Sequence, residues 1–459
     1  MTAIHPDPSL LKRFLRGELA ASERKSVVRH LISGCEACRG LAGELWQAAE
    51  GGQVPEPEPA ASDYQKAMER AVRMARDRKP ALAAARSKTP ELLAEILAAT
   101  PRGRLALAEG DPRFRTPSLC EALLARRAES SFWSLGEVGA IPKRGKSQIE
   151  PRELADLALI LAGKLEAAEW GTSIVRDLEA RAWAHRGDMA REAGRLDEAQ
   201  RAFRMAQSLY ELSSQDPWDW AEISRYEARF ELARGQAEAA TALALESAAL
   251  YRKLGERELL SETLGEIGPM ALRARRPDLA IDSLAEAVEL IDPAREPRRL
   301  AVCLHWLGSL LARTERAREA LGHLWRARSL YERLGEPEAV LRVRWSEGRA
   351  ALAIGHPAEG EEVLLAVRGH LLASGLGQDA AGVLLDLVQL YLRQGRRQEM
   401  RELFAESIFL PYRTRDLERG TIAALLMLRR AIETESASAE MVCELADYLA
   451  ASRPIGRPG

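Results

Sequence analysis

Two cysteines and a histidine near the start of the chain have the spacing of metal ligands. Cys35 and Cys38 are separated by two residues, His30 precedes them, and a further histidine, His5, lies upstream. Two thiolates three positions apart, at a turn into a helix, can hold one face of a tetrahedral zinc ion, and an imidazole from the preceding helix can add a third ligand. The pattern predicts a zinc site. A fold that is retained without metal and a redox-active cysteine pair are the alternatives.

The elements that would position these side chains form a small three-helix unit. Helices are expected over 9–15 and 23–32, and a third follows Cys38 because apolar residues recur on one face. Such a small unit has little core, so zinc binding would add directly to folding, by on the order of 10 kcal/mol in small zinc peptides. Residues 51–61 alternate proline and glutamate and are expected to form an extended linker.

The segment FLRGELAASERKSVVRHLISGCEACRG resembles the zinc-binding anti-sigma-factor family. That family has a similar turn after its first helix, a helix that ends in His-Leu, and a Cys-x-x-Cys pair. The resemblance implies that His30, Cys35 and Cys38 are metal ligands and that His5 supplies the fourth. Four residues separate His30 from Cys35 here, where the family usually has three.

Much of the remaining chain repeats itself. The turn after the first helix of each unit falls at Gly194, Gly235, Arg275, Glu315, Gly355 and Gly395, which are separated by 41 residues once and by 40 thereafter. A small or slim residue precedes each turn by seven positions, and a large apolar residue follows it by nine in five of the six units. Each unit is predicted to form two amphipathic helices. One pair cannot bury its apolar face alone, so the units must stack.

The first unit resembles the tetratricopeptide repeat. The residues that carry the resemblance, in the spacing of that family, are Trp183, Gly187, Ala199, Phe203 and Ala206. The period exceeds the usual 34 residues, which implies longer helices or loops. The resemblance implies an all-α fold, a tetratricopeptide-type superhelical solenoid preceded by the small three-helix zinc-binding domain. A generic helical bundle is the alternative.

The expected organisation has four parts. They are the zinc-binding domain at 1–50, the linker at 51–61, a helical connecting region at 62–150, and repeats with degenerate capping helices at 151–455. In the connecting region, helices are expected over 62–78, 89–98 and 117–130, with Thr89 as an N-cap and Pro90 in the first helical position. The isolated Cys120, Cys303 and Cys443 are expected to be buried small apolar residues.

In tetratricopeptide arrays the first helix of each pair lines the concave face. Transferred by position, a partner-binding groove in this chain would include Arg181, Asp188, Arg191, Arg225, Arg229, His305, Arg342, Trp345 and Arg349. Six arginines against one acid suggest an acidic peptide or a free carboxylate as the ligand, because the planar guanidinium binds carboxylates through two hydrogen bonds. The alternative is that several of these are ordinary surface arginines.

Composition and motifs favour a binding protein. The net charge is −2, so no global field attracts nucleic acid or membrane, and neither is expected as a partner. The sequence has no Walker loop, no Gly-x-Gly-x-x-Gly, no Gly-x-Ser-x-Gly and no His-Glu-x-x-His, so we expect no enzyme. It also has no secretory signal and no apolar stretch long enough to span a bilayer, and five cysteines cannot all pair, which fits a reducing cytoplasm.

We therefore expect a cytoplasmic interaction scaffold that binds partner proteins or peptides on the concave face of its repeats. The alternative function is a soluble, zinc-dependent, anti-sigma-like regulator of transcription, whose partner would be a sigma factor. The expected cofactor in both cases is one zinc ion in the N-terminal domain.

Overall fold

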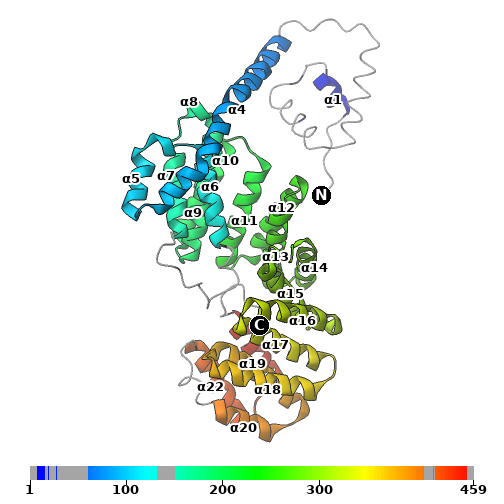
Figure 1. Cartoon of the computed structure of the whole chain (residues 1–459). Helices are drawn as coiled ribbons and strands as arrows, with labels where there is room; N and C mark the ends of the chain where they lie inside the picture. Colours follow the sequence, from blue (N-terminus) through cyan, green and yellow to red (C-terminus); the bar gives the residue numbers. More distant parts are fainter. Residues whose placement is uncertain are drawn as a thin grey trace. The chain divides into compact units, whose positions relative to one another are not determined.

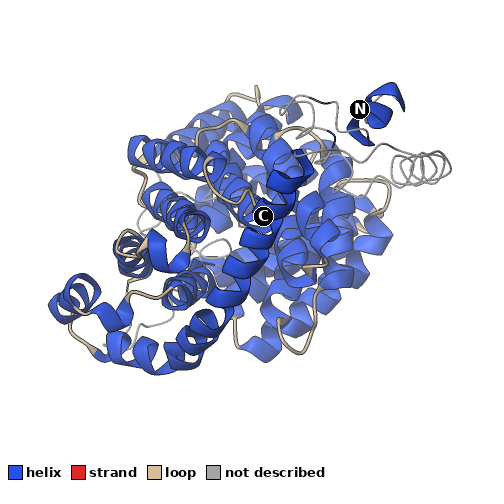
Figure 2. Ribbon diagram, turned by 90° about the horizontal axis from the view of Figure 1, so that it is seen from above, coloured by secondary structure: helices blue, strands red, loops and turns tan. Residues whose placement is uncertain are grey.

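The structure is a computed structural model of the 459-residue chain. It describes residues 8–15, 19, 27, 60–131, 150–407, 417 and 419–451. These residues form helices and no strand (Figure 2), and none of the helices among them is long and apolar enough to cross a bilayer. The chain divides into two compact units, residues 1–79 and 80–459.

The first unit contains α1 (Pro8–Leu15), which confirms the helix expected over 9–15. Leu10 and Phe14 of this helix pack against the buried Leu19 and Val27. The second and third helices expected in the zinc-binding domain lie outside the described residues.

The helix α4 (Ala60–Ala98) is continuous, so the break expected before Thr89 is wrong. The Thr89 hydroxyl donates to the carbonyl of Ala85 at 2.9 Å and therefore bonds back onto its own helix instead of capping a new one. Pro90 removes one backbone hydrogen bond. Leu92 and Ile96 lie in the same buried cluster as Ala85, and this packing keeps the helix intact past the proline.

The connecting region packs around one apolar cluster that extends into the first repeat. Its remaining elements are α5 (Pro101–Gly110), the short 3₁₀ helix η1 (Pro112–Phe114) and α6 (Pro117–Ser131). The helices α7 (Pro151–Ala162) and α8 (Ala167–Trp170) follow, before the first hairpin. α6 confirms the helix expected over 117–130. Proline occupies the first position of several of these helices, where its missing N–H has no helical partner to lose.

Six helical hairpins follow one another along the chain (Figure 1). Their first helices are α9 (Thr172–Glu192), α11 (Pro217–Ala233), α13 (Arg257–Arg273), α15 (Pro297–Leu311), α17 (Pro337–Ala353) and α19 (Gly377–Gln394). Their second helices are α10 (Leu196–Glu211), α12 (Ala237–Leu254), α14 (Pro277–Leu290), α16 (Ala317–Leu334), α18 (Pro357–Ala373) and α20 (Arg397–Ser407). The last two helices in the described part of the chain are α22 (Arg419–Glu433) and α23 (Ala439–Ala451). The chain therefore contains a tetratricopeptide-like array of helical repeats.

The turns between the paired helices lie where the repeat pattern predicts them. The backbone has a positive φ at five of the six predicted positions: Gly194, Gly235, Arg275, Gly355 and Gly395. Glycine adopts this left-handed conformation without a steric penalty and commonly ends helices in this way. Arg275, with φ of 56°, adopts it although it carries a Cβ.

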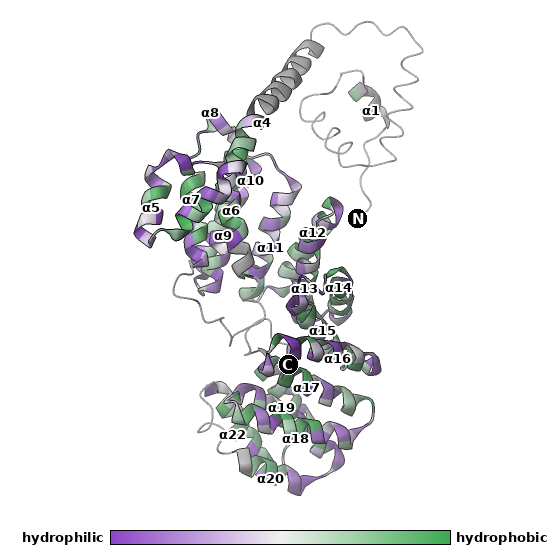
Figure 3. Cartoon of the chain, in the orientation of Figure 1, coloured by the Kyte–Doolittle hydropathy of each residue, from purple (hydrophilic) through white to green (hydrophobic). Residues whose placement is uncertain are grey.

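A small residue on each first helix allows the second helix to approach closely. A Cβ added to Gly308 would lie 2.7 Å from Leu324, and one added to Gly268 would lie 2.8 Å from Leu284. The predicted small column therefore packs directly against the predicted large column. Apolar and polar residues alternate along the helices (Figure 3), and the buried apolar side chains form clusters that span successive hairpins.

Two details distinguish individual helices. α13 contains Pro269 in its interior, which removes a backbone hydrogen bond within that helix. Among the isolated cysteines, Cys120 and Cys303 are buried as expected, whereas Cys443 on α23 is exposed, so the prediction is wrong there. α23 is the last helix of the described chain, and no hairpin follows it in that part to cover its outer face.

The close contact at Gly308 predicts opposite effects for two glycine-to-alanine substitutions. Gly308→Ala should lower the free energy of unfolding by up to about 2 kcal/mol, because overpacking costs about 1–3 kcal/mol and the gain in helix propensity returns about 1 kcal/mol. Gly322→Ala is the matched control, since a Cβ on this α16 glycine meets nothing within 4 Å, and it should be neutral or stabilising. Thermal and denaturant unfolding of both variants would test this, and equal effects would contradict the close contact.

Candidate functional site

Polar side chains link consecutive first helices at two sequence separations. Hydrogen-bonded pairs 37 residues apart are His185–Glu222, Arg229–Glu266, Ser309–Ser346, Arg342–Asp379 and Arg349–Asp386. Pairs 41 residues apart are Arg181–Glu222, Arg229–Asp188, His305–Ser346 and Trp345–Asp386. The two separations differ by about one helical turn, and Glu222, Ser346 and Asp386 each contact two successive turns of the preceding first helix. We call this set of pairs the first-helix ladder.

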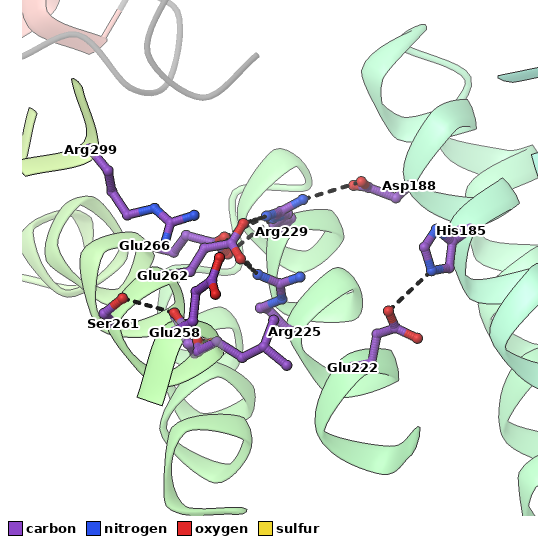
Figure 4. A network of polar contacts seen from close by, with 12 residues as sticks. His185, Asp188, Glu222, Arg225, Arg229, Glu258, Ser261, Glu262, Glu266 and Arg299 are labelled. Atoms are coloured by element: carbon purple, nitrogen blue, oxygen red, sulfur yellow. Dashed lines mark hydrogen bonds and ion pairs between the residues drawn. The ribbon is translucent and has the colours of Figure 1, made fainter. Parts of the chain in front are cut away.

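Arg229 is the centre of the ladder (Figure 4). Its Nε donates to Glu266 Oε2 of α13 at 3.0 Å, and its Nη1 donates to Asp188 Oδ2 of α9 at 3.3 Å. One guanidinium therefore joins three consecutive first helices. Arg225, one turn earlier on α11, forms an ion pair with Glu262 at 2.7 Å.

These charges are almost completely removed from solvent. Asp188 is 0% exposed, Arg225 2% and Arg229 3%. Isolated buried charges are strongly unfavourable, whereas paired and hydrogen-bonded ones are tolerated. The ladder therefore depends on every partner being present.

The ladder also sets the protonation states of its titratable groups. Burial opposes ionisation of Glu222, yet Arg181 and His185 together hold the pKa of this carboxyl well below its usual value. Burial, reinforced by the charge of Arg342, lowers the pKa of His305 to about 3. The carboxylate of Glu222 is therefore charged and the imidazole of His305 is neutral at pH 7.

All the residues proposed for the partner-binding groove lie on first helices, as the resemblance implied. The buried ones are Asp188, Arg225, Arg229, His305, Arg342 and Trp345. The partly exposed ones are Arg181, Arg191 and Arg349, whose side chains are 13%, 14% and 27% exposed. Their assignment to partner binding stays a prediction.

The excess of arginine that suggested an acidic ligand is balanced within the chain. Each of the six arginines forms an ion pair with a carboxylate of its own or a neighbouring first helix. The carboxylates that sequence reasoning overlooked are Glu222, Glu262, Glu266, Asp379 and Asp386. Their offset of 37 or 41 residues from an arginine or a tryptophan, close to the repeat period, was the signal that could have identified them.

The proposed metal ligands His5, His30, Cys35 and Cys38 lie outside the described residues. Across the described ranges, no three His, Cys, Asp or Glu side chains are arranged to hold a metal ion. The zinc site therefore stays a prediction from the sequence.

The ladder predicts a large difference between two arginine substitutions. Arg229→Met should destabilise the protein by about 3–5 kcal/mol, because it leaves buried Asp188 and Glu266 without their common partner. Arg397→Met removes an exposed pair with Glu435 and should change stability by at most about 1 kcal/mol. Denaturant unfolding measures both, and a small effect at Arg229 would show that the ladder contributes little.

Comparison with known proteins gives similarity at the level of whole structures. No family model matches the chain, and no curated protein matches it. Among solved structures, a Rap protein complexed with competence and sporulation factor is 12% identical, covering 73% of this chain and 87% of that one with a TM-score of 0.44. Aspartyl phosphate phosphatase F from Bacillus subtilis is 14% identical, covering 90% and 96%, with a TM-score of 0.43. The TPR-like repeats named for a kinesin light chain of Podosopora anserina are 19% identical, covering 43% and 97%, with a TM-score of 0.38.

Proposed function

We propose that this protein is an interaction scaffold that holds a protein or peptide partner on the surface formed by its first helices. The observation that carries the proposal is the first-helix ladder. Buried charge pairs tie α9 to α11, α11 to α13 and α17 to α19, and hydrogen bonds of Ser346 tie α15 to α17. The parts of the surface that these helices form therefore have a defined shape before a partner arrives. A surface that is already ordered loses less conformational entropy on binding.

The packing of the helices supports a concave binding side. The first helices pack directly on one another in the pairs α9–α11, α15–α17 and α17–α19, and within the described residues no consecutive second helices pack as closely. A stack whose units approach more closely on one side curves toward that side. Curved helical arrays offer an extended inner surface, which suits an elongated ligand.

The accessible part of this surface includes both charge and an aromatic ring. Arg181, Arg191 and Arg349 are partly exposed there, and Trp306 on α15 is partly buried at the edge of the core. An acidic segment of a partner would compete with Asp188 for Arg191 and with Asp386 for Arg349. We therefore retain an acidic partner as a proposal that is restricted to the exposed arginines.

Site-specific photocrosslinking tests the proposed surface. A photoreactive benzoylphenylalanine replaces Trp306 or Arg349 on first helices, or Trp325 on the second helix α16, which is 59% exposed. In the native cell, partner peptides should be crosslinked from the first-helix positions and identified by mass spectrometry. Crosslinks to one partner from position 325, with none from 306 or 349, would assign binding to the outer side instead.

Residues 1–50 support a second proposal, zinc-dependent regulation of a sigma factor. Its basis is the Cys-x-x-Cys pair after His30 and the resemblance described above. The purified full-length chain should contain one zinc ion, and Cys35→Ser/Cys38→Ser should lose the zinc and the sigma factor together, because thiolates are the expected ligands.

Cys443→Ser is the control for this experiment, since Cys443 is an exposed cysteine far along the sequence and its replacement should change neither. Elemental analysis by mass spectrometry measures the metal. A chain that purifies without zinc under reducing conditions contradicts the metal site, and sigma-factor binding that persists after zinc loss contradicts the regulatory role.

A further inference from the structure

A pocket of about 300 Å³ lies where the connecting helices meet the first two hairpins. Its wall comes from α4, α6, α9 and the start of α11, all within the unit 80–459. Four carboxylates line it, those of Glu121, Asp177, Asp216 and Asp219, against two guanidinium groups, those of Arg86 and Arg181. Of the residues that line it, Arg181 alone also belongs to the partner-binding surface of the proposed function.

Asp219 is a buried carboxylate that lacks a hydrogen-bond donor among the described residues. The residue is 8% exposed, and its side chain accepts no hydrogen bond from any residue in the described part of the chain. The nearest cation, Arg181 Nε, is 3.5 Å from Asp219 Oδ1 but donates to Glu222 at 2.8 Å. Asp177 and Asp216, by contrast, accept hydrogen bonds from the backbone N–H groups of Ser214 and Trp218.

The surroundings of Asp219 disfavour its charge. Burial and repulsion from Asp177, Glu222 and Asp216 raise the pKa of this carboxyl, and Arg181 lowers it, with a net result of about 7. The other titratable or charged groups around the pocket are Tyr210 on α10, Glu121 on α6 and Arg86 on α4. A cation placed in the pocket would therefore be attracted by a carboxylate that the chain itself leaves incompletely paired.

A second buried polar group lines the same pocket without a partner. Ser118, at the start of α6, is 7% exposed, and within the described residues its hydroxyl has no hydrogen-bond partner. Buried hydroxyls are normally hydrogen-bonded. Ser118 and Asp219 together offer an acceptor pair to a ligand that carries N–H donors.

The shape and chemistry of the pocket select the class of ligand. A bare metal ion is disfavoured, because among the residues the structure describes no three metal-ligating side chains converge. Leu82, Ile174 and Trp218 supply apolar wall between the carboxylates. We propose that this pocket binds an organic cation, an ammonium or guanidinium group on a short apolar stem, with Asp219 as its counter-ion and Ser118 as a hydrogen-bond acceptor.

The cation could be carried by a free small molecule or by a lysine or arginine side chain of a protein. Calorimetric titration of the full chain with agmatine and with the blocked peptide acetyl-Gly-Arg-Gly-amide separates these sources. Binding of either supports the site, and the tighter of the two identifies the source. Failure of both to bind at pH 8, or equal competition by magnesium chloride, overturns the proposal.

The affinity should depend on pH in a defined direction. Because the cation requires the charged carboxylate, affinity should be about tenfold weaker at pH 6 than at pH 8, and binding at pH 6 should release protons. Asp219→Asn should weaken binding at pH 8 at least tenfold and abolish this dependence. Asp282→Asn, which changes an exposed carboxylate on α14, should leave both unchanged.

The folding of the Asp219→Asn variant provides its own control. A carboxyl whose pKa is raised by folding stabilises the native state most below its unfolded pKa, and this contribution is lost as the pH rises through about 7. The variant should therefore melt no lower than the parent at pH 8. Ser118→Ala should weaken binding severalfold without changing the pH dependence, and a variant at 219 that is folded and binds normally would refute the assignment.

Discussion

The fold depends on how closely the two helices of each hairpin approach. Gly268, Gly308 and Gly348 each leave space for a leucine of the second helix, at distances where a Cβ could not fit. This contact sets the spacing within a hairpin, and that spacing determines where the next hairpin can pack. The shared apolar core builds on this contact.

Apolar packing alone would allow one hairpin to shift along the next, because the apolar faces of the hairpins are similar. The first-helix ladder opposes this, since a shift would separate buried charges such as Arg229 and Asp188. Buried ion pairs add little net stability relative to apolar residues, but breaking one is strongly unfavourable. The ladder therefore favours the native alignment of the first helices that it joins.

The sequence was sufficient for the repeats because their signals are local. Gly194, Gly235 and Gly395 mark turns through a backbone conformation that glycine favours, and the small and large columns follow helical periodicity. The continuity of α4 through Pro90 was missed because it depends on packing with distant helices, which outweighs the local signal. Most carboxylate partners of the arginines lie on a neighbouring first helix, so the charges of a single helix do not reveal these pairs.

The candidate sites also differ in whether their residues lie close together in the sequence. The buried position of Arg229 and the incomplete pairing of Asp219 arise from residues far apart in the sequence, so no local pattern reveals them. The predicted zinc ligands, in contrast, form a local pattern that can be read from the sequence, and they lie outside the described residues. The sequence thus reveals candidate sites that consist of a local motif, and the structure reveals those that depend on how distant charged residues pair.

Pro269 gives the third first helix a mechanical property that its neighbours lack. A proline inside a helix removes one backbone hydrogen bond and permits bending at the preceding turn. A helix that lacks one backbone hydrogen bond bends more readily than its neighbours. If the array of hairpins were bent by a force on its two ends, the bending should occur mainly at α13. The hairpins before α13 and those after it would then move as two rigid bodies.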